Sequence, residues 1–398
     1  MVVVEVCMRV LTLNCWGLKY IAQQRVARLR AIGDFLAATE YDVVALQEIW
    51  VESEDWRYVK SVCAPRYPHS AFFFAGAFGA GLALLSRHPI VARDTHMYTL
   101  TCTPVFVHQG DWIAGKACGC ATIAHPDLGL VDVWNTHLTA LGGQSGPESR
   151  RAFRASEAFE LAALCRASVD KGRHVVLMGD LNSLPDSLCL ALLRRYALLE
   201  DAFEQAGSAE CAITCDSPRN TWTAGKHVDA LAVQQGGKRL DYVLFRSPAG
   251  GAVLRATSLS LVLDAPIPGL GVSYSDHFGV EAELSLAGEQ AERTPDCAPL
   301  HDTARLLRGA YASARREQAT HLGAFGAALA GALAAVIGAA CAVAWLSPGS
   351  SAGAVAALGV ATIAFSWFGT TALYSGVVWG EWHKRAIRGL IARIDTES

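Results

Sequence analysis

The feature that most constrains the fold is a long stretch of chain without charge. From residue 322 to residue 380 the sequence contains no Asp, Glu, Lys or Arg. An α-helix needs roughly 20 apolar residues to cross about 30 Å of hydrocarbon, so this stretch is long enough for two spans. The segment SPGSSAG, residues 347–353, divides it. We therefore expect a hairpin of two transmembrane helices, at about 322–346 and 352–379.

The residues around these spans predict their orientation. Tryptophans suited to the membrane interfaces stand at 345, 379 and 382, and the segment between the spans is uncharged. Arginines precede the first span, and basic residues follow the second: Lys384, Arg385, Arg388 and Arg393. By the positive-inside rule both flanks face the cytosol. A buried helical pair of a soluble protein is the alternative, and the charge-free length disfavours it.

The start of the chain agrees with this orientation. Its apolar run is interrupted by Glu5 and Arg9, which is not the pattern of a secretory signal. We expect a two-pass integral membrane protein of the endoplasmic reticulum or another internal membrane, with its N-terminal domain in the cytosol. The 12 cysteines should then stay reduced, and their spacing does not match a zinc site. A net charge of −3 argues against tight, non-specific binding of nucleic acid.

Before residue 287 the hydrophobic pattern alternates between helix and strand. Residues 23–38 place apolar side chains at helical spacing, and a strand-like run to Glu48 follows. The same alternation recurs at 159–169, before the apolar run at 174–178. This pattern predicts an α/β layered fold.

Polar residues stand at or beside the ends of six separate apolar runs. Asp180 and Asn182 follow one run within GDLNSLPDS and point the same way from an extended backbone; alone, such a pair equally often caps a turn. In SDHFGV a carboxylate precedes His277, where it could set the pKa and tautomer of a general base. The other positions are Asn14, Glu48, His137 and Asp241. A packed core gives no reason for this arrangement, which is typical of a phosphoryl-transfer site.

The motifs LTLNCWG, LQE, WNTHL, GDLNS, RLDYVLF and SDHFG occur in this order between residue 9 and about residue 282. As a set they resemble the endonuclease/exonuclease/phosphatase superfamily, and within it the neutral sphingomyelinases and inositol phosphosphingolipid phospholipases C. The resemblance implies a deoxyribonuclease I-like α/β fold, a two-sheet sandwich flanked by helices. It also implies magnesium-dependent hydrolysis of sphingophospholipids to ceramide and a phosphorylated headgroup.

The resemblance further implies roles for the polar residues. Glu48, with Asn14 and Asp276, would hold Mg²⁺, with Mn²⁺ able to substitute, because carboxylate and amide oxygens suit these ions. His277, oriented by Asp276, would deprotonate the attacking water, and Asp180 would position that water. Asn182 and His137 would stabilise the developing negative charge. Asp241 would orient the other histidine, although a structural role remains open.

Three further segments carry expectations. In GDWIAGKA, residues 110–117, Asp111 and Lys116 are similar to a pair thought to act as a switch in neutral sphingomyelinases; solvated loop charges are the alternative. Residues 71–90 contain glycines at 76, 79 and 81 but no Walker motif, so we expect a glycine-kinked strand and turn. The resemblance suggests that this turn lines the substrate, and its aromatic character would suit a lipid. Arg150, Arg151 and Arg154 could meet anionic headgroups, with a solvated helix start as the default interpretation.

The predicted organisation is a catalytic domain at 1–286, a linker with a short basic helix at 287–320, two transmembrane helices within 321–383, and a basic cytosolic tail at 384–398. The expected partners are a membrane lipid substrate and an anionic phospholipid activator, without nucleic acid. Two alternatives stay open: a membrane-tethered nuclease such as a deadenylase, and a non-catalytic membrane adaptor. The sequence does not decide between choline, inositol and lyso-lipid headgroups.

Overall fold

The computed structural model describes residues 7–101, 114–140, 148–289 and 293–398. The chain divides into two compact units, Met1–Thr303 and Ala304–Ser398. The whole of the predicted catalytic domain lies in the first unit. The boundary falls inside a helix, α8 (Ala298–Trp345), and within the segment 287–320 predicted as a linker with a short basic helix.

The first unit is built on two six-stranded sheets. The first has the order β11-β12-β1-β2-β4-β3. Its strands are β1 (Cys7–Asn14), β2 (Val43–Gln47), β3 (His69–Phe73), β4 (Leu82–Ser86), β11 (Ala252–Val262) and β12 (Gly279–Glu289). β1 and β2 are parallel, and the remaining pairs are antiparallel.

The second sheet has the order β5-β6-β7-β8-β10-β9. Its strands are β5 (Ile90–Met97), β6 (Ala117–His125), β7 (Gly129–His137), β8 (His174–Asp180), β9 (Glu200–Asp201) and β10 (Asp241–Arg246). Here β7 and β8 form the parallel pair. Each sheet therefore has one parallel pair near its centre.

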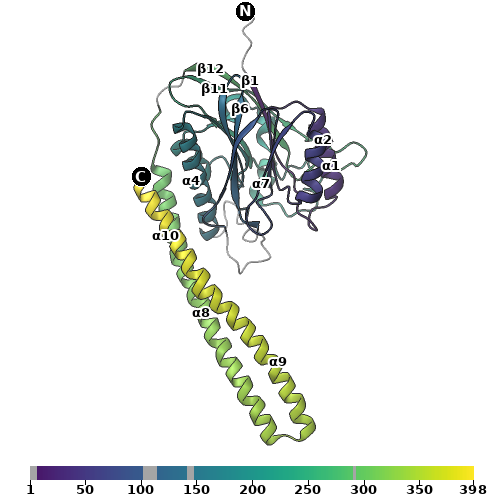
Figure 1. Ribbon diagram of the computed structural model, residues 1–398, viewed down its shortest axis with the longest axis vertical. Coiled ribbons are helices and arrows are strands. Elements are labelled where there is room, and N and C mark those ends of the chain that lie inside the picture. Colours follow the sequence, from purple (N-terminus) through teal and green to yellow (C-terminus); the bar gives the residue numbers. More distant parts are fainter. Residues whose placement is uncertain (1–6, 102–113, 141–147, 290–292) are drawn as a thin grey trace, which may run out of the picture. The chain divides into compact units, whose positions relative to one another are not determined.

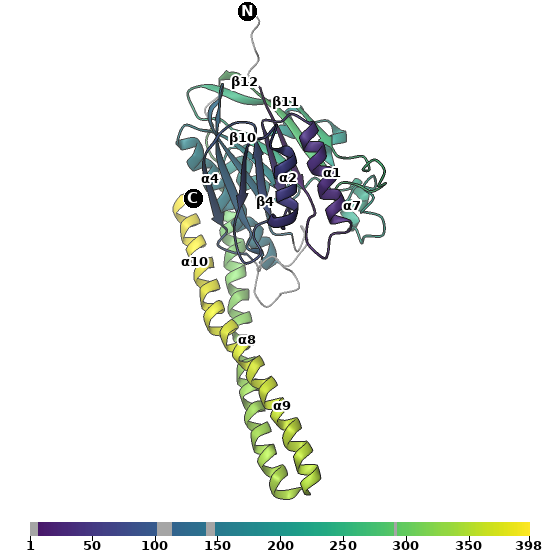
Figure 2. The same ribbon diagram turned by 45° about the vertical axis from the view of Figure 1, so that its right-hand side comes forward.

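Helices flank the two sheets (Figure 1, and turned in Figure 2). α1 (Arg25–Ala38) and α2 (Arg57–Cys63) pack on one side, and α4 (Glu148–Asp170) lies on the other. The shorter helices are α5 (Leu188–Ala191), α6 (Ala202–Ala206) and α7 (Ala230–Gln235), with single helical turns at Glu52–Trp56, Leu192–Tyr196 and Ala209–Ala212. The predicted helices at 23–38 and 159–169 correspond to α1 and to the second half of α4. The predicted fold, a two-sheet sandwich flanked by helices, is confirmed.

The core follows from the alternation of apolar residues along the strands. Side chains from both sheets, such as Val10 and Val43 on one and Val133 and Val176 on the other, form one buried cluster. Such burial contributes roughly 25 cal/mol per Å² of apolar surface. A polar link crosses the cluster, because the buried Gln47 Nε2 donates to Asn135 Oδ1 at 2.8 Å.

Strand direction brings the functional candidates to one place. β1, β2, β3, β7 and β8 all end at the same edge of the sandwich, and β4, β6, β10 and β12 begin there. We call this the carboxyl edge, and the other one the opposite edge. Open α/β sheets place their ligands at such an edge, which makes it the place to look for chemistry.

The second unit is helical. α8 runs without interruption to Trp345. After it come α9 (Pro348–Leu373), a π-helical turn (Tyr374–Trp379) and α10 (Gly380–Glu397), which together form one continuous helix. Two helices are long and apolar enough to cross a membrane. The short basic helix predicted within 287–320 is not separate, since residues 317–321 contain no Gly or Pro and continue α8 into the apolar stretch. The second helix begins at Pro348 rather than residue 352, because Pro fits the first turn of a helix.

Candidate active site

Asn14 stands at the centre of the polar cluster at the carboxyl edge. Its side chain is buried at the end of β1. Asn14 Nδ2 donates to Asp180 Oδ2 at 2.9 Å and to Glu48 Oε1 at 3.2 Å. One amide therefore joins the ends of β1, β2 and β8, across both sheets.

Local backbone geometry aims these carboxylates. Asp180 ends β8 after Gly179, whose φ is +145° and where a Cβ would lie 2.0 Å from the Thr136 carbonyl oxygen. Only glycine lets β8 approach β7 this closely, which explains the Gly-Asp pattern. Glu48 itself has a φ of +54°, a left-handed conformation that is strained for a residue with a Cβ. This conformation ends the extended backbone of β2 and lets the Glu48 carboxylate reach Asn14.

His277 is paired with Asp241, not with its sequence neighbour. His277 Nδ1 and Asp241 Oδ2 lie 2.8 Å apart, and both residues are buried. The prediction that Asp276 orients His277 is therefore corrected, as is the prediction that Asp241 orients the other histidine. Asp276 lies in a bend, and its Oδ2 atom lies 3.6 Å from Lys226 Nζ.

The electrostatics of the pair favour a strongly basic imidazole. Burial acts to lower the pKa of His277, but the Cys215 sulfur, Asp241 and Asp180 act against it and raise the pKa well above 6.5. Burial also raises the pKa of Asp180, to about 7, although His277 counteracts this. His277 Nε2 lies 3.8 Å from Asp180 Oδ2. The two groups therefore face each other as a coupled acid–base pair.

Glu48 and Asp276 provide the second half of the cluster. Burial, and then the negative charge of Asp276, raise the pKa of Glu48. The two negative charges repel each other, and a cation between them would remove this repulsion. Asp180, Asp241 and His277 also each offer one ligand atom within 4.8 Å of the others. The donors around Glu48 are carboxylate and amide oxygens, a set that fits a hard divalent cation.

His137, at the end of β7, joins the same cluster. Its Nε2 lies 3.6 Å from Asp180 Oδ2 and 3.9 Å from Glu48 Oε1. On the other side of the ring, the buried Lys116 Nζ lies 3.3 Å from His137 Nδ1. Burial, followed by the charge of Lys116, lowers the pKa of His137 well below 6.5. Because an ammonium can only donate, Nδ1 accepts and Nε2 carries the ring proton.

This contact changes the interpretation of Lys116. The sequence suggested a cation offered to the substrate phosphate, whereas the structure places the ammonium against His137 Nδ1 and the Leu138 carbonyl oxygen, each at 3.3 Å. Asp111, its predicted partner, lies outside the described residues. The switch therefore stays a prediction.

Asn182 completes the predicted set at the carboxyl edge. Its backbone N–H donates to Asp180 Oδ1 at 2.8 Å, and its side-chain amide donates to the Leu138 carbonyl oxygen at 3.0 Å. All the predicted catalytic and metal-binding side chains thus lie at or beside one edge. Arg154, by contrast, is buried and donates to the Thr139 carbonyl oxygen, so it is not part of a solvated helix start.

Sequence reasoning missed the segment that supports His277. Asn220 Nδ2 donates to the Ser275 carbonyl oxygen, and Trp222 Nε1 donates to the Ser273 carbonyl oxygen, each at 2.8 Å. Lys226 Nζ lies 3.6 Å from Asp276 Oδ2. These residues belong to irregular backbone, where no hydrophobic period marks them. The only signal was the cluster of Ser, Asn, Thr and Gly, which indicates a loop but no partner.

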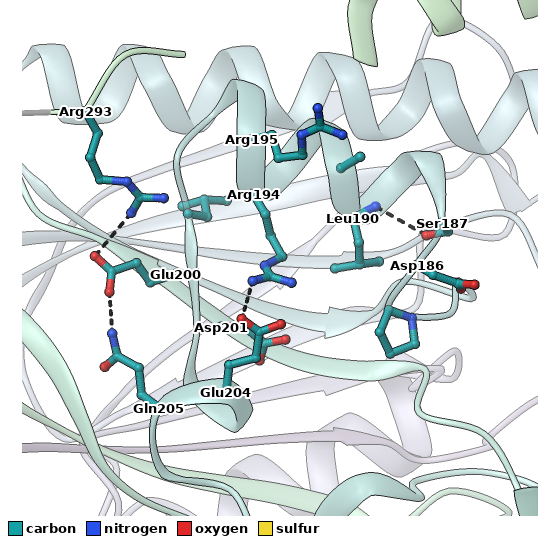
Figure 3. Close-up of a pocket in the computed structure, with 13 residues that line it drawn as sticks. Asp186, Ser187, Leu190, Arg194, Arg195, Glu200, Asp201, Glu204, Gln205 and Arg293 are labelled. Carbon is teal, nitrogen blue, oxygen red and sulfur yellow. Dashed lines mark hydrogen bonds and ion pairs between the residues drawn. The ribbon is translucent and has the colours of Figure 1, made fainter. Parts of the chain in front are cut away.

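A cavity of about 480 Å³ lies away from this cluster (Figure 3). Arginines and acidic residues face each other across it. Arg293 is 3.4 Å from Glu200, and Arg194 is paired with Glu204. None of the predicted catalytic residues is among those that line it. This cavity is therefore distinct from the predicted catalytic cluster.

Comparison with known proteins agrees with this geometry. The Endonuclease/Exonuclease/phosphatase family profile matches residues 11–277, which include every polar side chain of the cluster. The chain is 34% identical over 305 residues to the inositol phosphosphingolipids phospholipase C of Schizosaccharomyces pombe, covering 70% of this chain and 68% of that protein. It is 31% identical over 293 residues to the human sphingomyelin phosphodiesterase 2, and the match covers 72% of this chain and 67% of that protein.

A solved structure supports the fold. The crystal structure of sphingomyelinase C from Streptomyces griseocarneus superposes with a TM-score of 0.53 at 22% identity, covering 71% of this chain and all of that one. Enzymes of the matched family use divalent metal ions, which agrees with the buried acidic and histidine cluster. The chain belongs to the endonuclease/exonuclease/phosphatase family of enzymes.

Proposed function

We propose that this chain is a magnesium-dependent phospholipase C of sphingophospholipids. It hydrolyses the phosphodiester between ceramide and the headgroup, and it releases ceramide and a phosphorylated headgroup. The observation that carries the proposal is the Asp241–His277 pair facing Asp180, Glu48 and His137 at one edge, in a chain whose relatives are named for this reaction.

His277 acts as the general base. The bond to Asp241 holds the ring proton on Nδ1, so the lone pair of Nε2 faces the side on which Asp180 lies. There it accepts a proton from water as the water oxygen attacks phosphorus. The bond from phosphorus to the ceramide oxygen breaks, and that oxygen takes a proton from solvent to become the ceramide hydroxyl. His277 then releases to solvent the proton that it accepted, which restores the base. Asp180, held by the Asn14 amide and the Asn182 N–H, positions the water.

His137 stabilises the charge that develops on the phosphoryl oxygens. Since its Nδ1 accepts from Lys116, its Nε2–H is available as a fixed donor toward the centre of the cluster. The low pKa keeps the ring neutral, so it donates a hydrogen bond without competing for the proton taken by His277. Asn182 supports this arrangement from the neighbouring strand end.

Glu48, Asn14 and Asp276 form the proposed magnesium site. Burial and then the charge of Asp276 raise the pKa of Glu48, and a bound cation would offset both effects. Magnesium, when bound, supplies positive charge that neutralises the phosphate and the leaving oxygen. The protein's own part is to hold the oxygen donors in place, through the Asn14 amide and the strained backbone of Glu48.

The apolar helices of the second unit suit a substrate that resides in a bilayer. With both flanks basic, the two-pass hairpin would keep the catalytic unit on the cytosolic side of its membrane. An enzyme tethered in this way meets its lipid in two dimensions instead of three.

The test is a substrate panel with the full chain in vesicles. Sphingomyelin, inositol phosphoceramide, a lyso-phospholipid and poly(A) would be supplied in turn with magnesium, and the products identified by mass. We expect ceramide from at least one of the two sphingolipids, and its loss in Glu48→Gln at the same magnesium concentration. Cleavage of poly(A) with both sphingolipids intact would show instead a tethered nuclease.

A further inference from the structure

Exposed apolar side chains of the first unit gather at the carboxyl edge. The connection after β1 carries Leu18, Tyr20 and Ile21, the β3–β4 connection carries Phe74 and Phe78, and the β11–β12 connection carries Leu270. Tyr20 is 94% exposed, Phe78 71% and Ile21 66%. All of them follow or precede strands that end or begin beside the catalytic cluster.

The opposite edge differs. Among the described residues of the first unit, the exposed large apolar side chains at the opposite edge are Val91 and Leu130. They are the second residues of β5 and β7. Single exposed apolar residues are ordinary on protein surfaces, but a gathering on one side marks an interaction surface. The asymmetry follows the chemistry, because the cluster of His277, Asp180 and Glu48 opens at the same edge.

The connection after β1 is held rigidly in its outward position. The buried Arg28 donates to the carbonyl oxygens of Cys15, Trp16 and Gln23, at 3.0, 2.7 and 2.8 Å. These contacts lie on both sides of Tyr20 and Ile21 in the sequence. The arginine therefore fixes the base of the loop from which the exposed Tyr20 and Ile21 extend.

The β3–β4 connection is braced by aromatic contacts. Phe74 packs edge-on against Phe72, with ring centroids 5.3 Å apart, and Phe72 in turn lies 6.0 Å from the buried Trp56. At the end of the turn, a Cβ on Gly81 would lie 3.0 Å from the Trp50 ring. The exposed Phe74 thus extends an aromatic row that begins in the core, so its position costs little conformational entropy on binding.

We propose that this surface, the apolar rim formed by Tyr20, Ile21, Phe74, Phe78 and Leu270, inserts into the interfacial layer of the bilayer that holds the substrate. The proposal rests on the proposed function, since a phosphodiester at headgroup depth reaches the catalytic cluster only if the carboxyl edge meets the membrane. Aromatic and aliphatic side chains are those that enter the headgroup and acyl boundary. The same chain supplies two apolar helices, which keep a bilayer at hand.

The activity test compares two groups of variants in the full chain, reconstituted into vesicles. One carries Tyr20→Ser, Ile21→Ser, Phe74→Ser and Phe78→Ser; the control carries Val91→Ser and Leu130→Ser at the opposite edge. Each is assayed on long-chain sphingolipid in the bilayer and on a short-chain, monomeric analogue in solution. We expect the ratio of bilayer to monomer rates to fall at least tenfold for the rim variant and to stay within twofold of the parent for the control. Equal ratios in the two variants would overturn the proposal.

A second measurement does not depend on hydrolysis. Phe78→Trp and Leu130→Trp would each be placed in phosphatidylcholine–sphingomyelin vesicles that contain phosphatidylcholine brominated on its acyl chains. We expect Phe78→Trp to add fluorescence that bromine quenches, and Leu130→Trp to add fluorescence that it does not. If the quenching occurs but no lipid is hydrolysed, the proposed function fails and the membrane contact stands. If the added fluorescence is not quenched at either position, the rim does not enter the bilayer.

Discussion

Asp241 and Asp276 both lie near His277, but they contact different groups. Asp241 accepts from the ring at 2.8 Å, while Asp276 lies near Lys226 and raises the pKa of Glu48. Asp241→Asn should lower kcat by roughly 10² to 10⁴ at saturating magnesium, since the base loses the group that sets its tautomer. Asp276→Asn should mainly raise the magnesium concentration needed for half-maximal rate.

Magnesium titrations of both variants separate these effects. A full rate for Asp276→Asn at high magnesium, with Asp241→Asn still impaired, fits the structure. The reverse pattern would return the orienting role to Asp276.

Lys116 and His137 should act as one unit. If Lys116 works by holding His137 in its Nε2–H form, Lys116→Met should lower kcat at least tenfold, and Lys116→Gln, which keeps a donor, should recover part of the loss. Adding His137→Ala to Lys116→Met should lower kcat little further, because without Lys116 the His137 ring no longer holds the Nε2–H form that donates. Multiplicative losses in the double variant would mean that the lysine acts on the substrate directly.

His125, far from the site, should make stability depend on pH. Burial, and then the charge of His88, lower the pKa of His125 below 6.5, so the unfolded chain binds a proton before the folded one does. The free energy of unfolding therefore keeps its full value above pH 6.5. It decreases as the pH falls toward the pKa of His125 in the folded chain, by at most about 1.4 kcal/mol per pH unit.

A matched variant isolates this residue. His125 Nδ1 accepts from the N–H groups of Asp127 and Leu128 at 3.2 Å, a place that an asparagine oxygen can fill. His125→Asn should keep the midpoint of thermal unfolding at pH 7.5 in detergent micelles and reduce its decrease between pH 6.5 and pH 5.5. An unchanged decrease would place the titration elsewhere, for instance at His174, whose pKa burial also lowers.

The sequence predicted which residues gather, but not how they pair. Asn14, Glu48, His137, Asp180 and Asp241 were found because each ends or begins a strand, and strand ends at one edge must meet. The Asp241–His277 bond joins residues that are far apart in sequence, and adjacency in the chain wrongly favoured Asp276. Lys116 was found by resemblance, while its contact with His137 depends on the register of β6 against β7.

At the scale of elements, the apolar hairpin is held by close approach of small residues. A Cβ on Gly376 would lie 3.0 Å from Leu322 Cγ and 3.3 Å from its backbone nitrogen, whereas one on Gly359 would meet nothing within 4 Å. Gly376→Leu should destabilise the pair of helices by about 1 to 3 kcal/mol through overpacking. Gly359→Leu, a substitution of the same size, should leave stability nearly unchanged.

Thermal unfolding in detergent micelles, followed by the fraction that stays monodisperse, measures both variants. Equal midpoints would show that α8 and the Tyr374–Trp379 turn do not pack as described. Hydropathy alone predicted the spans but not their ends, since it cannot show that residues 317–321 continue α8 or that Pro348 starts α9.

At the scale of the whole molecule, the chain contains a two-sheet sandwich and a pair of apolar helices. The sandwich gathers carboxylate, amide and imidazole groups at one edge. The family follows from the fold and the relatives together. In the proposed reaction water attacks phosphorus and the ceramide oxygen leaves, whichever headgroup the lipid carries.

The origin of the new oxygen tests this central claim most directly. The full chain in sphingolipid vesicles would be incubated with magnesium in ¹⁸O-labelled water, and both products weighed by mass spectrometry. We expect one ¹⁸O in the phosphoryl group of the released headgroup and none in ceramide, because water attacks phosphorus in the proposed reaction. We expect no product from His277→Ala on the same time scale. Label in the ceramide hydroxyl, or a product that retains phosphate on ceramide, would contradict it.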